Sequence, residues 1–393
     1  MKTILVFVAL MLAAFSAHGA QEQGQFYPEE YFVTHIAADG GSVEITKFTG
    51  TGTEVRIPPY IQGLPVTTIG DMAFWGRQLT YVAIPESVIH IGAGAFNGNL
   101  LESVVIPRGV TMIRLWAFRE NRLTSVVIPE GVTYIGNGAF RGNELVSVVI
   151  PDSVTNIGEQ AFLYNQLACV TLPNSLTRIE ALAFAMNLIA EVNIPEGVIY
   201  IGVGAFTVNR LTSVTIPAGI RIINDWAFAR NQLASVNIPD SVERIGDSAF
   251  YSNRLTSVVI PDGVRFIGHG AFEENLLAEV VIPNSVEYID NRAFLVNRLT
   301  RVDLPESVIE IGMLAFASNR LAGVTIPGNV TRIENWAFQW NSLEYVVIPP
   351  SVTHIGDWAF AWNRLGSVAI PNSEAEVAEN AFDPGVAVTI GAE

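Results

Sequence analysis

The chain of 393 residues consists of one 22-residue unit repeated almost to its end. The dipeptide Ala-Phe recurs every 22 residues from Phe74 to Phe382, which is (382 − 74)/22 = 14 steps and therefore 15 copies. A proline after Ile or Leu recurs from Pro85 to Pro371, which is (371 − 85)/22 = 13 steps and 14 copies. A unit this short cannot bury a hydrophobic face alone, so the repeats must stack as a solenoid in which each unit contacts its neighbours.

Each position of the unit has a predicted structural role, as residues 123–140 illustrate. Val126 and Ile128 alternate with outward-facing residues, which is the period of a strand. Pro129 ends this strand because it has no N–H for the ladder, and Gly131 completes a turn. Phe140 is expected to lie in a short helical turn and to fill the interior beneath the next unit.

An asparagine ladder has the same period. It runs from Asn99 to Asn363, which is (363 − 99)/22 = 12 steps and 13 copies. One interpretation is a row of amides that faces solvent and binds a ligand. The other is that each side chain turns inward and satisfies backbone groups that would otherwise be bare. The unbroken recurrence favours the inward interpretation.

The repeat pattern resembles a known family. Asparagine followed by L-x-x-V-x-I is the spacing of a leucine-rich repeat, and the continuation from Ile260-Pro261 to Ala271-Phe272 resembles the BspA-type leucine-rich repeats of bacterial surface proteins. The resemblance covers about residues 55–383 and departs in having Asn where many members have Cys, and 22 residues where 23 is common. It implies a curved solenoid displayed outside the cell and often used for adhesion or protein binding, without naming a ligand.

The expected fold class is an α/β repeat. We predict a right-handed leucine-rich-repeat solenoid of about 15 repeats, with a parallel β-sheet on its concave face, short helical turns and a β-hairpin cap. The hairpin is expected around Asp39-Gly40, between two strand-like runs. The predicted divisions are a signal peptide (1–20), an N-terminal β cap (21–54), the solenoid (55–383) and a C-terminal cap strand (384–393).

The first residues have the pattern of a secretory signal peptide. Lys2 is followed by the apolar run Ile4–Phe15 and then by small residues, so we expect cleavage after Gly19 or Ala20. The alternative, a membrane anchor, is disfavoured because a span needs about 20 apolar residues. The chain is therefore expected to be exported to the medium, the cell surface or the periplasm, with no membrane span.

Charge and residue usage exclude several functions. The formal net charge of −16 disfavours nucleic acid as a partner. The single cysteine, Cys169, excludes an internal disulfide and a cysteine-based zinc site. His90 and His354 share a repeat position but lie (354 − 90)/22 = 12 repeats apart, so no histidine pair is expected to share a metal. No hydrolase or phosphate-loop motif occurs, and we therefore predict no enzyme activity, no catalytic residues, no metal site and no cofactor.

Two charged rows are predicted along the rims of the solenoid. Acids follow the repeat proline at seven positions: Glu86, Glu130, Asp152, Glu196, Asp240, Asp262 and Glu306. Arginines follow the repeat asparagine at six positions: Arg122, Arg210, Arg254, Arg298, Arg320 and Arg364. Pairs such as Asp240 and Asp262 could hold calcium, but acids also suit a solvated turn, and this second interpretation is favoured.

Four tryptophans in two adjacent repeats are the candidate binding residues. Each pair is four residues apart and flanks a ladder phenylalanine: Trp336 and Trp340 in one repeat, Trp358 and Trp362 in the next. On a helical turn, residues four apart share a face, so with the phenylalanines inside these rings should point outward. Contiguous exposed aromatic rings usually mark a contact surface. The alternative is that the rings pack on each other or against the C-terminal tail.

These features lead to a first hypothesis and an alternative. The first is a secreted or surface-exposed, non-enzymatic binding module for a protein or glycan of a host or neighbouring cell. The alternative is a structural or self-associating protein of the cell envelope. A polysaccharide-processing enzyme is disfavoured, because nothing in the sequence would separate the pKa values of two periodic carboxylates.

Overall fold

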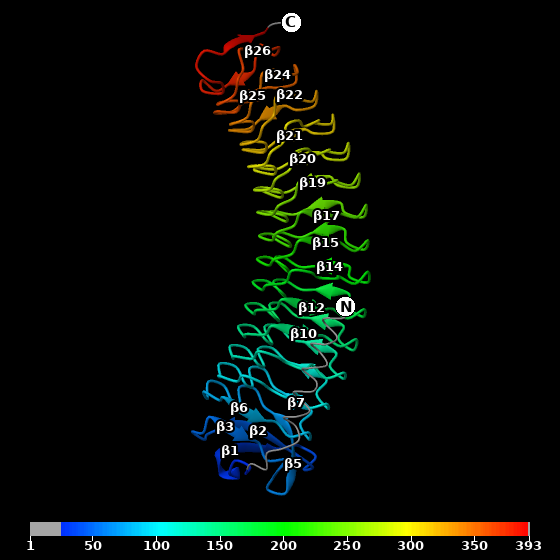
Figure 1. Cartoon of the computed structure of the whole chain (residues 1–393), viewed down its shortest axis with the longest axis vertical. Helices are drawn as coiled ribbons and strands as arrows, with labels where there is room; N and C mark the ends of the chain where they lie inside the picture. Colours follow the sequence, from blue (N-terminus) through cyan, green and yellow to red (C-terminus); the bar gives the residue numbers. More distant parts are fainter. Residues whose placement is uncertain (1–24, 392–393) are drawn as a thin grey trace.

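The computed structural model describes residues 25–391, which form one long solenoid (Figure 1). The expected signal peptide, residues 1–20, lies outside the described residues. Successive turns stack from β1 at one end to β26 at the other, so residues 22 apart in the sequence lie side by side. Among the described residues, no helix has the length and apolar character needed to cross a membrane.

Two long sheets run along the solenoid, and their repeating strands are two residues long and parallel. The isoleucine of each strand is buried and its neighbour faces outward, as at Tyr134–Ile135. The first sheet is ten-stranded, in the order β1 (Phe32–Ile36), β2 (Val43–Phe48), β5 (Leu64–Ile69), β7 (His90–Ile91), β8 (Met112–Ile113), β9 (Tyr134–Ile135), β11 (Asn156–Ile157), β13 (Arg178–Ile179) and β14 (Tyr200–Ile201), with β4 (Tyr60–Ile61) beside β5. The second is eight-stranded, in the order β16 (Ile222–Ile223), β18 (Arg244–Ile245), β19 (Phe266–Ile267), β20 (Tyr288–Ile289), β21 (Glu310–Ile311), β23 (Arg332–Ile333), β25 (His354–Ile355) and β27 (Glu376–Val377).

The Val-x-Ile segments, where we expected the main sheet, pair only in short pieces. They form two-stranded parallel sheets: β3 (Glu54–Arg56) with β6 (Tyr81–Ala83), β10 (Ser147–Val149) with β12 (Cys169–Thr171), β15 (Ser213–Thr215) with β17 (Ser235–Asn237), β22 (Gly323–Thr325) with β24 (Tyr345–Val347), and β26 (Ser367–Ile370) with β28 (Ala387–Ile390). Other turns have a single bridge, such as Val105 with Val127. The repeat proline directly follows each of these segments except β28, and it cannot extend the ladder. The expected parallel sheet is present, but its continuous part lies just before the repeat glycine.

The expectation of short helical turns is wrong. Within residues 25–391, helix is confined to the 3-10 turn η1 (Glu29–Tyr31). The residues two before and two after each ladder phenylalanine have positive φ from Phe74 to Phe360, as at Trp116 (56°) and Glu120 (53°). Their N–H groups, with that of Phe118, donate to carbonyl oxygens of the next turn at 2.8 to 3.0 Å. Bonds to the next turn thus alternate with bonds within the turn, such as the one from the Arg119 N–H to the carbonyl oxygen of Trp116 at 3.1 Å, and the segment does not continue as a helix.

The phenylalanine ladder is the core, as predicted. The rings stack along the solenoid with centroids 5.1 to 5.9 Å apart from Phe74 to Phe382, and most are fully buried. Phe48 extends this stack, with its centroid 5.3 Å from that of Phe74. It lies 26 residues before Phe74, outside the 22-residue register, and it gives the solenoid about sixteen turns instead of the fifteen counted from the repeat.

The asparagine ladder turns inward, which confirms the second interpretation of these residues. The Asn121 Nδ2 donates to the carbonyl oxygens of Phe96 at 2.9 Å and Phe118 at 3.2 Å. Its Oδ1 accepts from the N–H of Leu101 at 3.1 Å. Each amide thus joins two consecutive turns and satisfies backbone groups that the short strands leave unpaired.

Both ends of the solenoid are covered by short strands. At the N-terminal end, β1 and β2 form the expected antiparallel hairpin, and β2 pairs in parallel with β5 at the start of the first long sheet. The Tyr27 ring packs edge-on against Phe48, 5.1 Å away, and closes that end of the ring stack. At the C-terminal end, β28 pairs in parallel with β26.

Candidate binding surface

All seven tryptophans lie on one edge of the solenoid, formed by the turns around the ladder phenylalanines. Each occupies one of three positions relative to its phenylalanine: two before (Trp116, Trp226, Trp336 and Trp358), one after (Trp75) or two after (Trp340 and Trp362). We call this surface the turn edge. It is the part of the fold where side-chain size is least constrained, because Gly, Ser, Glu and Arg occupy the same positions in other turns.

Three of the four candidate tryptophans form one contiguous cluster near the C-terminal end. Trp340 and Trp362 have ring centroids 5.7 Å apart and are tilted by 55°. Trp358 stacks on Trp362 at 5.1 Å and 16°. Trp340 is 57% exposed and Trp362 is 48% exposed, whereas Trp336 and Trp358 are half-buried. We refer to Trp340, Trp358 and Trp362 as the tryptophan cluster.

The backbone conformation at the cluster differs from the helical turn that the sequence predicted. The two positions do not share one face of a helical turn, because all four tryptophans have positive φ, between 55° and 60°. At Trp336, Trp340 and Trp362 the side chain projects from a tight turn while the N–H group donates to an oxygen of the next turn. Trp340 and Trp362 therefore lie in consecutive turns at the same register and meet side by side.

The backbone beneath the cluster is held at the C-terminal cap. The carboxylate of Asp383 accepts from the N–H of Trp362 at 2.8 Å and from that of Asn363 at 3.0 Å. The N–H of Trp340 donates to the carbonyl oxygen of Ala361 at 3.1 Å. The rings thus stand on turns that are already hydrogen-bonded, so a ligand would meet a backbone that needs little ordering.

The turn edge also holds aromatic and arginine pairs that the sequence analysis missed. The Arg119 guanidinium lies 5.4 Å from the Trp116 ring, and that of Arg230 lies 5.7 Å from Tyr251. Trp226 meets Tyr251 edge-on at 5.8 Å. The signal was available in principle, since arginines and tyrosines recur at positions next to the ladder phenylalanine, but the sequence does not show which of them pair across turns.

One buried acid lies on the same edge. Glu273 is 8% exposed, and its carboxylate is 3.7 Å from the guanidinium of Arg292. Burial raises the pKa of Glu273, and Arg292 opposes this rise only in part. We therefore expect the free energy of unfolding to depend on pH through this carboxylate.

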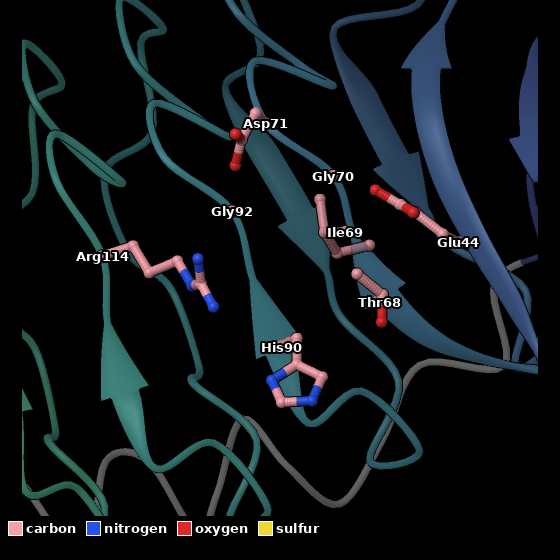
Figure 2. A pocket seen from close by; sticks show the side chains of 8 residues that line it. All are labelled: Glu44, Thr68, Ile69, Gly70, Asp71, His90, Gly92 and Arg114. Carbon is pink, nitrogen blue, oxygen red and sulfur yellow. The ribbon is translucent and has the colours of Figure 1, made fainter. Parts of the chain in front are cut away.

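A second candidate site is a hollow of about 270 Å³ near the N-terminal end, where β2, β5 and β7 meet. Figure 2 shows the side chains of Arg114 and Glu44 at opposite sides of this hollow, with His90 between them. Gly70 and Gly92 help to form it because they have no side chains there. The hollow has charged groups of both signs and no Trp, Tyr or Phe ring, so we treat the tryptophan cluster as the stronger binding candidate.

The other chemistry-bearing residues are dispersed along the solenoid. Among residues 25–391, no three His, Cys, Asp or Glu side chains gather closely enough to hold a metal ion. Cys169, on β12, is a free and partly exposed thiol. His90 and His354 lie on β7 and β25, in different long sheets.

Comparison with known proteins identifies the repeat. The family model described as BspA type leucine rich repeat region matches residues 67–189, 162–277 and 266–385, which is most of the chain. A search of curated proteins finds no match.

Solved structures agree with this fold. A leucine-rich repeat protein from Bacteroides ovatus aligns with a TM-score of 0.68 at 24% identity, covering 94% of this chain and 100% of that one. A leucine rich cell surface protein from Faecalibacterium prausnitzii aligns with a TM-score of 0.50 at 24% identity, covering 94% and 96%. The pneumococcal vaccine antigen PcpA aligns with a TM-score of 0.54 at 17% identity, covering 94% and 99%. At these identities the likeness shows the fold alone.

Proposed function

The chain belongs to the BspA-type leucine-rich repeat family, and on that premise we propose that it is an exported, non-enzymatic binding module for a protein or glycan of a host or neighbouring cell. A leucine-rich-repeat solenoid generally serves as an interaction scaffold, because stacked turns present an extended surface. The Faecalibacterium neighbour is described as a cell surface protein, which supports an extracellular setting.

The observation that carries the proposal is the exposed tryptophan cluster. Large aromatic rings in contact with each other and with solvent are costly for a protein that binds nothing, and tryptophan is among the residues most enriched at binding hot spots. Here Trp340 and Trp362 are each about half exposed on a rigid edge of the fold. The absence of enzymatic activity is proposed because the histidines, the cysteine and the acids are spread over many turns instead of converging on one site.

Capture experiments test this function. The mature chain, residues 21–393, would be immobilised and exposed to extracellular-matrix proteins and to a glycan array. We expect saturable binding that weakens by tenfold or more when Trp340 and Trp362 are both replaced by serine. Trp226→Ser is a matched control on the same edge, and we expect it to bind like the wild type. No binding to either ligand class would contradict the proposal.

The second candidate is self-association as an envelope protein, and one observation favours it. Val259 and Val281 pair across consecutive turns and are 79% and 73% exposed, which gives one flat face an apolar patch. Sedimentation velocity over a hundredfold concentration range distinguishes the two candidates. Assembly that Val259→Thr with Val281→Thr abolishes would favour the structural role, whereas a monomer at all concentrations would favour ligand binding.

A further inference from the structure

The repeats also have a period that is longer than one turn. Three features recur every 110 residues, which is five turns. The first is an exposed isoleucine at a position where most other turns have threonine. The second is a residue other than glycine (Arg, Asn or Glu) at the position of the repeat glycine, and the third is a tryptophan two residues before the phenylalanine. The positions are Ile89, Ile199 and Ile309; Arg114, Asn224 and Glu334; and Trp116, Trp226 and Trp336. The solenoid is therefore built from blocks of five turns, and corresponding residues in two blocks have the same backbone environment.

The last block departs from the others at the tryptophan cluster. Trp340, Trp358 and Trp362 replace Arg230, Ser248 and Ser252 of the middle block, and Glu120, Gly138 and Gly142 of the first. All nine residues have positive φ, between 52° and 68°. Because a left-handed residue with a side chain is disfavoured by roughly 1–2 kcal/mol and glycine is not, the fold gives no reason for tryptophan here. The cluster occurs in one block alone, and folding does not require its tryptophans. We therefore look for a ligand that would explain them.

The geometry of the cluster fits a small, flat ligand. A tryptophan offers about 150–250 Å² of contact area, so the exposed parts of these rings provide roughly 300 Å², well below the 800 Å² per partner of a standard protein interface. The facing rings of Trp358 and Trp362 are in contact, with centroids 5.1 Å apart. They leave no gap in which a quaternary ammonium group could sit between two faces, as it does in an aromatic cage. The rings form a platform with one tilted wall, Trp340.

Negative charge beside the cluster disfavours anionic ligands. The last turns of the solenoid, residues 335–383, contain six carboxylates and one arginine on all their faces together, a net charge of 1 − 6 = −5. Asp357 is exposed beside Trp358, and the Asp383 carboxylate is bonded to the backbone of Trp362. Sulfated or uronic-acid polymers and nucleic acids would be repelled at this end. The carboxylates can instead accept hydrogen bonds from hydroxyl groups.

From these observations we propose that the tryptophan cluster binds a neutral glycan, whose sugar rings lie on Trp340 and Trp362 and whose hydroxyl groups face the acids beside them. The C–H face of a pyranose is apolar and slightly positive, so it complements the negative face of an indole ring and is removed from water there. This inference rests on the proposed binding function and names the ligand class of its site.

The test uses the mature chain and neutral hexasaccharides of glucose, N-acetylglucosamine, mannose and xylose, measured by calorimetry and saturation-transfer NMR. Hyaluronan hexasaccharide is the anionic probe and tetramethylammonium the cationic one. We expect at least one neutral hexasaccharide to bind and the two charged probes not to bind. The block-matched variant Trp340→Arg, Trp358→Ser, Trp362→Ser should weaken this binding by tenfold or more, and Trp226→Ser should leave it unchanged. Since the variant carries the residues of the middle block, it should fold, and the single variant Trp340→Arg gives a second reading if it does not.

Three outcomes would overturn the inference. If no neutral glycan binds at millimolar concentration while a protein ligand binds through the cluster, the proposed function stands and the ligand class is wrong. If a neutral glycan binds equally well to the block-matched variant, the function stands and the site is wrong. If tetramethylammonium or hyaluronan binds at the cluster more tightly than every neutral probe, the cluster prefers a charged ligand and is not a site for a neutral glycan. Failure to bind any protein or glycan would contradict the proposed function itself.

Discussion

The side-chain amide of Asn231 donates to the carbonyl oxygen of Phe206, in the preceding turn, at 2.9 Å. The same nitrogen donates to the carbonyl oxygen of Phe228 in its own turn at 3.1 Å, and the Oδ1 accepts from the N–H of Leu211 at 3.0 Å. One buried side chain, 7% exposed, therefore satisfies backbone groups of two turns. The phenylalanine stack supplies apolar burial, and the asparagine ladder allows the backbone around it to be buried as well.

Replacing this asparagine should be as damaging as removing core volume. In Asn231→Ala, buried backbone groups lose their partner, and each unsatisfied group costs about 1–3 kcal/mol. We expect a loss of roughly 3 kcal/mol or more in the free energy of unfolding, measured by urea denaturation. The control is Asn237→Ala, because Asn237 is six residues further on and exposed. Equal stabilities of the two variants would contradict the role assigned to the ladder.

Loss of one phenylalanine should divide the solenoid. Phe228 is fully buried between Phe206 and Phe250, with centroids 5.8 and 5.9 Å away. Phe228→Ala should cost roughly 3–5 kcal/mol. Because each turn contacts its neighbours alone, calorimetry should show two separate transitions, and hydrogen exchange should accelerate most in the turns beside residue 228. The control is Phe266→Ala on the outer side of β19, and a single transition near the wild-type temperature for both variants would contradict the core role of the phenylalanine stack.

The sequence predicted the parts of the fold that depend on period and missed those that depend on backbone conformation. The ladders through Phe140 and Asn121 are simple consequences of a 22-residue recurrence and of what a buried ring or amide must do. Phe48 was missed because it is 26 residues from Phe74. The turn around each phenylalanine was expected to be helical because positive φ at a residue such as Trp340 leaves no mark in the sequence when glycine is not used.

The sequence predicted which residues form the candidate site, but not which of their side chains are in contact. The spacing of the four tryptophans indicated a shared edge, and three of them meet there. Trp358 stacks on Trp362, whereas Trp336 remains apart. This difference depends on the directions of the side chains within their turns. The pairing of Arg230 with Tyr251 depends on distances across turns, which a one-dimensional pattern does not contain.

Glu273 should make folding stability depend on pH. Its pKa is raised above 4.5 in the folded state, chiefly by burial, so the folded chain holds this proton to a higher pH than the unfolded chain does. The stability contributed by protonation is therefore present below the ordinary glutamate pKa and is lost as pH rises through the raised value. Glu273→Gln should raise the melting temperature at pH 7 and have little effect at pH 3.5.

A matched acid distinguishes this effect from net charge. Glu287 is exposed, and Glu287→Gln should leave the melting temperature nearly unchanged at both pH values. If the two variants behave alike at pH 7, the general negative charge of the protein is responsible and burial of Glu273 is not.

Calcium should leave the solenoid unchanged. Asp240 and Asp262 occupy consecutive turns of the acidic rim, and no cluster of metal-ligating side chains is found among the described residues. A ligand that does not prefer the folded state cannot shift the unfolding equilibrium. We expect melting temperatures with 5 mM calcium and with chelator to agree within about 1 °C. A saturable rise with calcium that Asp240→Asn with Asp262→Asn removes would show that the rim is a binding site.

Removing the exposed rings should hardly change stability. In Trp340→Ser with Trp362→Ser, the chain loses ring contacts worth about 0.5–1.5 kcal/mol each, but two large side chains also leave positions of positive φ, where φ is 57° and 55°. Ser252 occupies the position of Trp362 in the middle block with the same backbone, so the fold accepts serine there. We expect the free energy of unfolding to change by less than about 1 kcal/mol in urea denaturation, because surface substitutions usually stay within about 0.5 kcal/mol. A loss of about 3 kcal/mol or more would mean that these rings are part of the core, and the cluster would then no longer be a candidate binding surface.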